Sequence, residues 1–454
     1  MEADMPHSLA ELLADYAAGR RLPSEAIEAA IATAQECRAG IRAFAEIDGR
    51  RARLSAAVSD GRYRDQTARA LEGVPIGVKD LFDTAGLATR YGSPAYSENV
   101  PAADAEMVRI LTENGAIIVG KTTTHEFAWG VTTASEHFGD TLNPWDHNRI
   151  PGGSSGGMAA AIAYGAVSAG LGTDTGGSVR IPAALCGVVG FKPTYGVLST
   201  EGVFPLAPSL DHVGVLGRSV NDVRVIAAAL GIKSNSFQTS PWRLGILDRT
   251  DDRPISPDVR RSFELAVSIL GSHYKVVETN YLPSFRRGFE AFAGIVLAEG
   301  GIVHFSRHDR QYIQAMYGAE TALRLALAEG ATIGTYAESQ QTRREFVYQL
   351  ESAMSNLDFL LLPTCPCAAP PLGTDRITIG SWNGSIREAL MMYTAPFNLA
   401  GMPAISLPMF PAAVDGMPIG LQIVAGRGRD EALLAFASEV EARLGVRPNG
   451  DERK

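Results

Sequence analysis

Two glycine-rich loops, Gly152-Gly153-Ser154-Ser155-Gly156-Gly157 and Gly172-Thr173-Asp174-Thr175-Gly176-Gly177-Ser178-Val179-Arg180, each stand between apolar stretches of the chain. Glycines around serines allow backbone conformations that a Cβ forbids, and they expose N–H groups that can hold an anion. The alternative is a flexible turn, because glycine and serine are common in loops. The presence of two such loops favours a functional site over two flexible turns.

The apolar runs around these loops are typical of buried strands. We expect strands at 74–78, 117–119, 166–171, 188–191, 244–247, 274–278, 357–362 and 404–407. Helices are expected from Ser8 onward, at 24–37, from the cap Ser219 onward and at 257–271. Because strands and helices alternate without a Pro/Ser-rich spacer, we predict one α/β domain over 1–454. Residues 1–60 form its N-terminal helical segment, and 282–354 form a helical cap or side layer.

The composition excludes several classes of protein. The 454 residues include 41 Lys plus Arg against 50 Asp plus Glu, with a net charge of −9 and four cysteines. This mixture excludes collagen, coiled-coil, disulfide-scaffold and disordered proteins. No basic run suggests a nucleic-acid partner. The acidic start predicts no export signal, and the most membrane-like stretch, 158–172, is too short to span a bilayer, so we expect a cytoplasmic protein.

The loops themselves leave several chemistries to compare. A phosphate loop would end in Gly-Lys-Ser/Thr, which Gly156-Gly157-Met158 does not supply. Gly152 to Gly156 fits the G-x-S-x-G elbow of α/β-hydrolases, an esterase alternative that needs a later histidine base, for which His212 is the best candidate. His304 and His308 lie four residues apart without the glutamate of a zinc-protease helix, so we interpret them as a solvated helix face. We expect no metal and no cofactor.

Lysine is scarce, with six residues in the whole chain. A lysine in apolar surroundings can lose its proton and act as a base, which arginine cannot do. Lys79, behind the run Val74 to Val78, is the best placed for this role. The competing interpretation is a strand-end lysine with its ammonium group in solvent.

Several motifs, in their order and spacing, resemble the amidase signature family of serine hydrolases. They are Gly73 to Asp80, Gly152 to Gly157, Gly172 to Arg180 with Pro182-Ala183, Gly187 to Thr194, Ser209-Leu210-Asp211, Phe397 to Ala404 and Gly416 to Gln422. The similarity covers roughly residues 65 to 430. It implies a single large, mixed, twisted β-sheet covered by helices on both faces.

By that resemblance the catalytic residues are Ser178 as nucleophile, Ser154 as a bridging serine after a cis peptide bond, and Lys79 as base. The oxyanion hole consists of the backbone N–H groups of Thr175, Gly176, Gly177 and Ser178. The resemblance places Ser155, Asp174 and Arg180 around these residues as support, with Asp174 and Arg180 able to pair. Lys121 and Lys192 have family counterparts and are assigned to structure.

The resemblance also bears on the substrate. Segments that match pocket walls in relatives contain Phe127, Trp129, Met391, Met392, Tyr393 and Phe397, which would make an apolar cleft. The alternative for each is ordinary core packing. Glutamine-hydrolysing members of tRNA-dependent amidotransferases carry an Asp where this chain has Met391, and methionine cannot pair with a substrate ammonium. We therefore expect hydrolysis of a neutral aryl or hydrophobic amide, with carbamates and esters as further substrates, by a free-standing enzyme or a homodimer.

Overall fold

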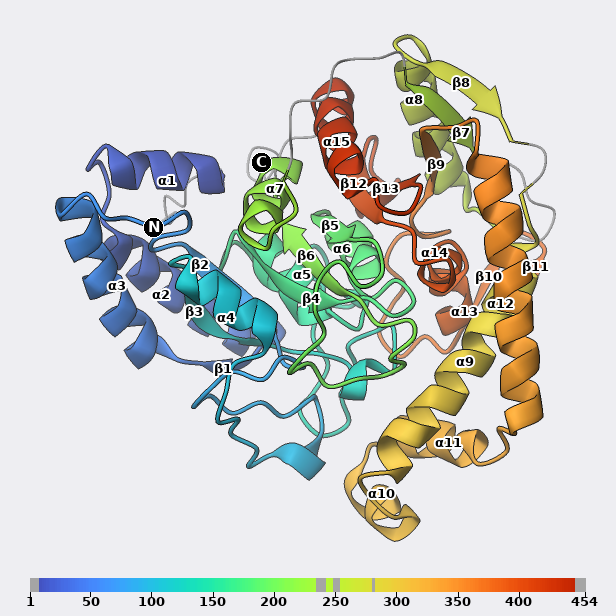
Figure 1. Cartoon of the computed structure of the whole chain (residues 1–454), viewed down its shortest axis with the longest axis horizontal. Helices are drawn as coiled ribbons and strands as arrows, with labels where there is room; N and C mark the ends of the chain where they lie inside the picture. The colour runs from blue at the N-terminus through green and yellow to red at the C-terminus, as the bar shows by residue number, and fades with distance from the viewer. Residues whose placement is uncertain (1–7, 234–241, 248–253, 280–281, 446–454) are drawn as a thin grey trace.

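The computed structural model describes residues 8–233, 242–247, 254–279 and 282–445. Its strands are, in chain order, β1 (Phe44–Ile47), β2 (Pro75–Lys79), β3 (Ile117–Thr122), β4 (Ala169–Thr173), β5 (Val189–Lys192), β6 (Val213–Gly217), β7 (Arg243–Ile246), β8 (Lys275–Glu278), β9 (Phe359–Pro363), β10 (Arg376–Ile379), β11 (Trp382–Ser385), β12 (Ala404–Met409) and β13 (Ile419–Ala425). One sheet of 11 strands has the order β1-β3-β2-β4-β6-β5-β12-β13-β9-β7-β8, and β10 pairs with β11 in a separate hairpin (Figure 1).

The α-helices are α1 (Leu9–Ala17), α2 (Pro23–Ile41), α3 (Gly49–Arg64), α4 (Glu106–Glu113), α5 (Gly156–Tyr164), α6 (Arg180–Cys186), α7 (Val220–Ala229), α8 (Pro257–Gly271), α9 (Phe285–Phe305), α10 (Arg310–Met316), α11 (Ala319–Ala328), α12 (Ile333–Met354), α13 (Ile386–Met391), α14 (Ala395–Leu399) and α15 (Asp430–Leu444). Two short 3₁₀ helices span Pro94–Tyr96 and Glu126–Ala128. Ser8 and Ser219 cap α1 and α7 as predicted, because each hydroxyl accepts a backbone N–H of the first turn.

The large sheet is mixed. Strand β2 runs parallel to both β3 and β4, and β7 runs parallel to β8 and β9. The other neighbouring strands are antiparallel. The carboxyl ends of neighbouring parallel strands meet at one edge, where open α/β sheets bind ligands. Here that edge brings the end of β2 beside the end of β4.

Helices cover both faces of the sheet. Helix α5 contacts both α2 and α6 on one face, whereas α7 and α15 pack together on the other. Helix α5 consists mostly of alanine and glycine and is buried up to Ala163, so its backbone can lie close to the strands. This arrangement confirms the expected mixed sheet between two helical layers.

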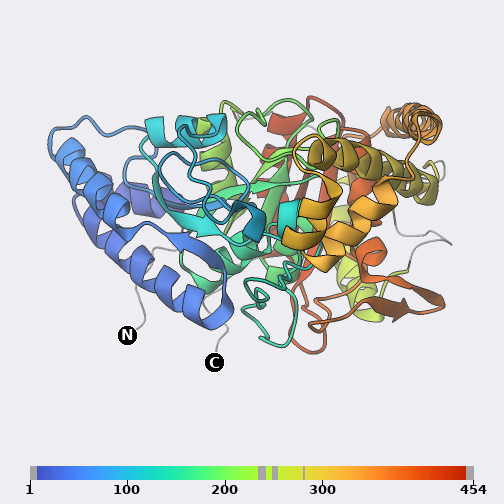
Figure 2. The same ribbon diagram turned by 90° about the horizontal axis from the view of Figure 1, so that it is seen from below.

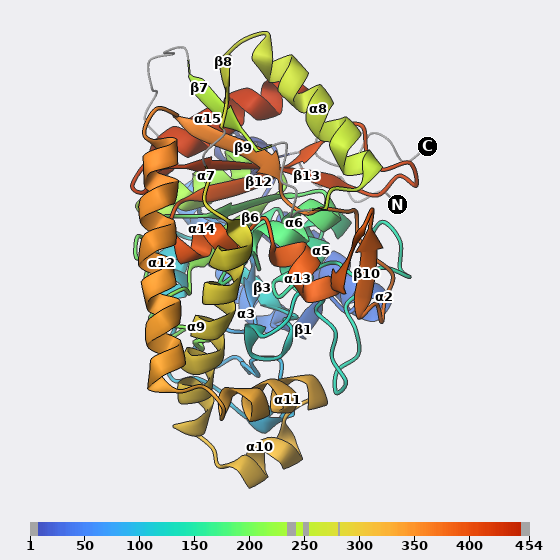
Figure 3. The ribbon, with the colours of Figure 1, turned by 90° about the vertical axis from the view of Figure 1, so that its right-hand side faces the viewer.

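The two helical segments lie at opposite ends of the molecule. Helices α2 and α3 lie at one end, and α9 and α12 lie toward the other (Figures 1 and 2). Figure 3, seen from that second end, has α9 to α12 in front. Residues 282–354 contain helices only, whereas residues 1–60 also contain β1, which pairs antiparallel with β3 at the sheet edge. The helical pattern of that segment does not indicate this four-residue strand.

Helix α9 is unusually long and apolar. Within the described ranges, α9 is the helix that is long and apolar enough to cross a membrane, and 56% of its most apolar window is buried inside the molecule. Burial of this kind is typical of a core helix, which satisfies the same criteria.

Candidate active site

The end of β2 carries Lys79, and the end of the adjacent parallel strand β4 carries Thr173. The Lys79 Nζ lies 2.7 Å from Ser154 Oγ and 2.7 Å from Thr173 Oγ1. Thr173 is a contact that the sequence did not single out, although it stands inside the second glycine-rich loop. The sheet thus gives Lys79 two hydroxyl partners.

Lys79 is completely buried, and no carboxylate of the described residues lies within 4 Å of its Nζ. Burial lowers the pKa of Lys79 well below its usual value, and the more distant charges of Asp174 and Asp211 oppose this only in part. The interpretation of Lys79 as a strand-end lysine with its ammonium in solvent is therefore wrong. A neutral amine can donate to one hydroxyl and accept a proton from the other.

The other two buried lysines have different partners. Lys121 donates to Phe82 O at 2.5 Å and to Thr89 Oγ1 at 2.8 Å, and it lies 3.5 Å from the Asp80 carboxylate. Lys192 donates to Met402 O at 2.5 Å and Pro193 O at 3.1 Å. Each of these lysines has carbonyl or carboxylate partners, which only accept, so at those contacts it serves as a donor that joins backbone segments. Lys79 is bound by hydroxyls, which can also donate.

The serines of the two loops lie close together. The Gly153–Ser154 peptide bond is cis. Ser155 N–H donates to Ser178 O at 3.1 Å, and the Ser155 hydroxyl donates to Thr173 O at 3.1 Å. Ser154 and Ser155 are fully buried, whereas Ser178 retains 6% of its exposure, and the Ser178 hydroxyl forms no hydrogen bond within the described residues. Of the three, Ser178 is the one that keeps exposed surface.

Four backbone N–H groups were expected to face an oxyanion, and one of them is already occupied. Gly177 N–H donates to Asp174 Oδ1 at 2.8 Å. The N–H groups of Thr175, Gly176 and Ser178 have no acceptor in the part of the chain that the structure describes. Three donors therefore remain available beside the Ser178 hydroxyl.

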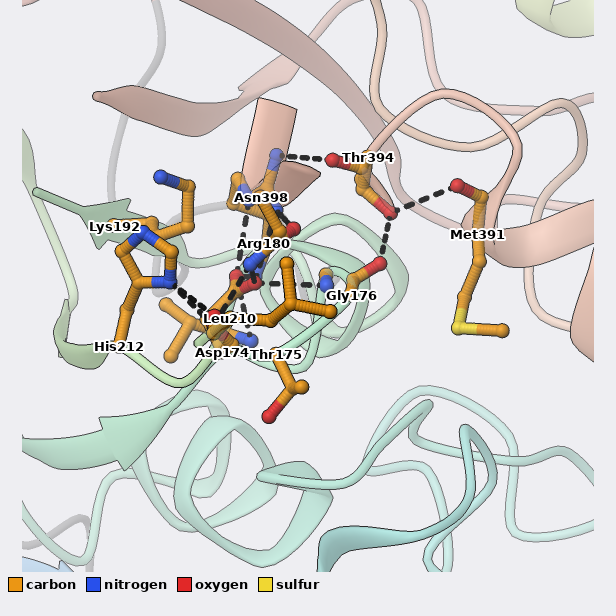
Figure 4. A network of polar contacts seen from close by, with 12 residues as sticks. Asp174, Thr175, Gly176, Arg180, Lys192, Leu210, His212, Met391, Thr394 and Asn398 are labelled. Carbon is orange, nitrogen blue, oxygen red and sulfur yellow. Dashed lines mark hydrogen bonds and ion pairs between the residues drawn. The ribbon is translucent and has the colours of Figure 1, made fainter. Parts of the chain in front are cut away.

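A buried network holds this loop (Figure 4). Arg180 and Asp174 form an ion pair at 2.9 Å with both side chains fully buried. Arg180 also donates to Asn398 Oδ1 and Gln422 Oε1, each at 2.6 Å, and to Thr394 O at 3.1 Å. Burial alone would raise the pKa of Asp174, but the Arg180 charge and its hydrogen bonds outweigh burial and lower it. The loop is thus tied to segments that are distant in the sequence.

Comparison with known proteins agrees with this geometry. Residues 25–434 match the amidase family model. The chain belongs to the amidase family. It is 34% identical to the AtzE component of 1-carboxybiuret hydrolase from Pseudomonas sp. (strain ADP), over 96% of this chain and 98% of the relative. It is also 34% identical to a glutamyl-tRNA(Gln) amidotransferase subunit from Picosynechococcus sp., over 88% and 90% of the two chains. A solved amidase superposes with a TM-score of 0.90 at 35% identity, covering 96% of this chain and 100% of that one.

The family shows that this chain is a hydrolase of C–N bonds. The chain matches the amidase family model over residues 25–434 and superposes on a solved amidase, so the esterase alternative with a histidine base is not supported. His212 Nδ1 lies within hydrogen-bonding distance of Leu210 O and Asp174 O, and burial lowers the pKa of His212 well below its usual value. This histidine supports the loop backbone.

Three of the predicted pocket residues of this amidase, Phe127, Trp129 and Phe397, pack against other aromatic rings. Phe127 and Trp129 are buried against His304, and Phe127 also packs on Phe204. His304 is therefore buried, not on a solvated helix face, because Tyr317 and these rings cover it. Phe397 is buried against Phe285.

Of the other predicted pocket residues, Met391 lies beside the loop of residues 172–180 that carries Ser178, the expected nucleophile (the nucleophile loop). A Cβ built on Gly176 would lie 3.1 Å from Met391 Sδ. Tyr393 is buried with its hydroxyl donating to Pro254 O at 3.3 Å, and Met392 lines a separate cavity of about 630 Å³ with Phe289 and Trp382.

A cavity of about 310 Å³ borders the Lys79 partner Thr173 and the N–H donor Thr175. Its walls are mixed. The apolar residues come mostly from the loop before β6, namely Val203, Phe204, Pro205, Leu206 and Pro208, together with Leu81 and Ala128, and the polar ones include Thr200 and His212. Arg307 and Asp211 are its charged members, and the Asp211 carboxylate accepts from Thr175 Oγ1 at 2.6 Å and from two backbone N–H groups. The sequence did not single out Phe204 or Leu206, since neither stands in a strand or helix pattern.

No three His, Cys, Asp or Glu side chains of the described residues converge in a group that could hold a metal ion.

Proposed function

We propose that this amidase hydrolyses neutral amides with aryl or other apolar substituents through an acyl-enzyme on Ser178. Carbamates and esters would react through the same intermediate. The observation that carries the proposal is the buried Lys79 amine, which lies 2.7 Å from Ser154 Oγ without a carboxylate beside it in the described chain. A base of this kind can take a proton through one hydroxyl from another.

In the acylation step the Ser178 oxygen attacks the carbonyl carbon while its proton passes to Ser154 Oγ. The Ser154 proton passes to Lys79 Nζ. The carbonyl π electrons move to oxygen, and the N–H groups of Thr175, Gly176 and Ser178 stabilise that oxyanion. Removing one such donor costs about 10²- to 10³-fold in rate in other enzymes.

Collapse of the tetrahedral intermediate breaks the C–N bond. The proton returns from Lys79 through Ser154 to the leaving nitrogen, which departs as a neutral amine. Water then attacks the ester carbon by the same proton route and releases the acid and free Ser178. In each attack the proton passes through Ser154 to Lys79, and in each collapse it returns by the same route. Lys79 therefore serves as base and then as acid, and no additional acid is needed.

Two features support an apolar substrate. The cavity of about 310 Å³ that borders Thr173 and Thr175 has an apolar wall that includes Phe204 and Leu206, which could receive an apolar substituent. Met391, beside Gly176, is a thioether that offers no charge to a substrate ammonium. The names of the two relatives mark them as parts of larger enzymes, so activity of the isolated chain is part of the test.

The test is a panel of anilides, primary amides, carbamates and glutamine, assayed on the purified chain with intact-mass detection of the acyl-enzyme. We expect turnover of apolar anilides and a mass shift that Ser178→Ala abolishes, whereas Ser155→Ala retains the shift. Turnover confined to small charged amides, or to glutamine once a partner protein is supplied, would contradict the proposed substrate. A mass shift that persists in Ser178→Ala would contradict the nucleophile.

A further inference from the structure

The peptide unit that joins Gly176 to Gly177 is held at both ends. Its carbonyl oxygen accepts a hydrogen bond from Thr394 Oγ1 at 2.7 Å, and its N–H donates to Asp174 Oδ1 at 2.8 Å (Figure 4). A peptide unit is planar, so two bonds at opposite ends fix the direction of the whole plane.

This plane lies between two of the free N–H donors. Rotation of the unit changes ψ of Gly176 and φ of Gly177, which set how the N–H groups of Gly176 and Ser178 point relative to each other. Gly177 has φ of +129°, and a Cβ there would collide with Thr394 Oγ1. Two successive glycines permit many orientations, so the loop needs an external bond to select one.

Thr394 is itself firmly placed. It is fully buried, its carbonyl accepts from Arg180 Nη1 at 3.1 Å, and its N–H donates to Met391 O at 3.0 Å. The Gln422 Nε2 group donates to the preceding carbonyl, Tyr393 O, at 2.7 Å. The Thr394 hydroxyl has one proton, and Gly176 O at 2.7 Å is a nearer acceptor than Met391 O at 3.3 Å.

We infer that Thr394 is a positioning residue for the oxyanion site, which orients the Gly176 and Ser178 N–H groups by donating to Gly176 O. Thr394 acts on the transition state through the backbone and does not take part in proton transfer. The inference rests on the proposed function, because it assumes that the oxyanion forms at this loop.

The experiment compares Thr394→Val and Thr394→Ala, which lack the hydroxyl, with Thr394→Ser, which keeps it. Two hydroxyl-free variants are used because a valine methyl near Gly176 O could disturb folding, whereas alanine leaves space. We expect kcat to fall about 10- to 100-fold in both, in the range that small misplacement of catalytic groups produces, with KM nearly unchanged. Thr394→Ser should recover most of the wild-type rate.

A trifluoromethyl ketone, whose adduct with serine carries a tetrahedral oxyanion, gives the decisive readout. Its affinity should fall by the same factor as kcat, while the affinity of an apolar product acid stays constant. The pH dependence of acylation should also stay unchanged, because Thr394 has no contact with Lys79 in the described structure. If Thr394 contributed to stability alone, the ratio of the ketone affinity to the product-acid affinity would be the same in the variants as in the wild type.

Wild-type kcat and ketone affinity in both hydroxyl-free variants would overturn the inference, and so would an equal loss of ketone and product affinity. Failure of the proposed function is read separately, because it would appear in the wild-type chain as absence of both turnover and a Ser178 adduct.

Discussion

Replacing Asp174 by Asn tests the buried network that supports the nucleophile loop. The Asp174 carboxylate accepts from the N–H groups of Gly177 and Val179, from Asn398 Nδ2, and from two nitrogens of the Arg180 guanidinium. An asparagine keeps the size of the side chain but loses the charge, and its amide nitrogen cannot accept. At least one donor of Gly177, Arg180 or Asn398 would then be left without an acceptor.

The expected loss of stability follows from burial. Both side chains of the pair are fully buried, and removing one partner of such a pair typically costs about 3–5 kcal/mol. Arg180 would keep its contacts with Gln422 and Asn398, which are neutral and cannot replace the lost charge. We expect Asp174→Asn to lie within that range and to reduce turnover as well, since Gly177 N–H loses its charged acceptor.

The sign of the pH dependence adds a second check. The pKa of Asp174 is lowered in the folded protein, so its stabilisation is fully present above the unfolded pKa and is lost as the pH falls through the folded pKa. The difference between wild type and Asp174→Asn should therefore be largest near neutral pH and shrink in strong acid.

The assay is urea unfolding followed by tryptophan fluorescence at several pH values. Asp415→Asn is the matched control, because Asp415 pairs with Arg149 at 2.7 Å but its side chain is 45% exposed. An exposed pair contributes about 0–1 kcal/mol. A free energy of unfolding for Asp174→Asn within about 1 kcal/mol of the wild type would refute the assigned role of the network.

Two further predictions concern the base and the cavity. The rate of single-turnover acylation should rise with pH through the lowered pKa of Lys79, because only the neutral amine accepts a proton. The Lys79→Met variant should be folded but nearly inactive. A stopped-flow rate that does not change with pH, or an active Lys79→Met, would contradict this role. Phe204→Leu should widen the cavity beside Thr175 and shift the ratio of kcat/KM for bulky over small anilides about tenfold; an unchanged ratio would show that the substrate lies elsewhere.

The sequence predicts much of the fold because the central strands are continuous apolar runs. The expected runs at 74–78, 117–119, 188–191 and 404–407 correspond to β2, β3, β5 and β12. Such strands are buried on both faces and therefore lack polar interruptions. Strand β1 and the hairpin of β10 and β11 give weaker signals, because each is only four residues long and partly exposed.

The candidate catalytic residues were found through motif resemblance, and the structure adds what motifs cannot contain. Thr173 is one of several residues of the second glycine-rich loop in the sequence, and its contact with Lys79 depends on the pairing of β2 with β4. The cavity wall at Phe204 lies on a loop without periodicity, so neither helix nor strand patterns indicate which way it faces.

The shape of the nucleophile loop shows why local sequence is insufficient. Glycines at 176 and 177 allow many backbone paths, and the path that is adopted depends on bonds from Thr394 and on Asp174, which Asn398 and Arg180 hold in turn. Thr394 and Asn398 stand in the segment that leads into β12, the strand that pairs with β5 and joins the second half of the sheet. We therefore expect the assembled sheet to set the directions of the proposed oxyanion donors, so that a substitution far from Ser178 in sequence changes the rate without touching the substrate.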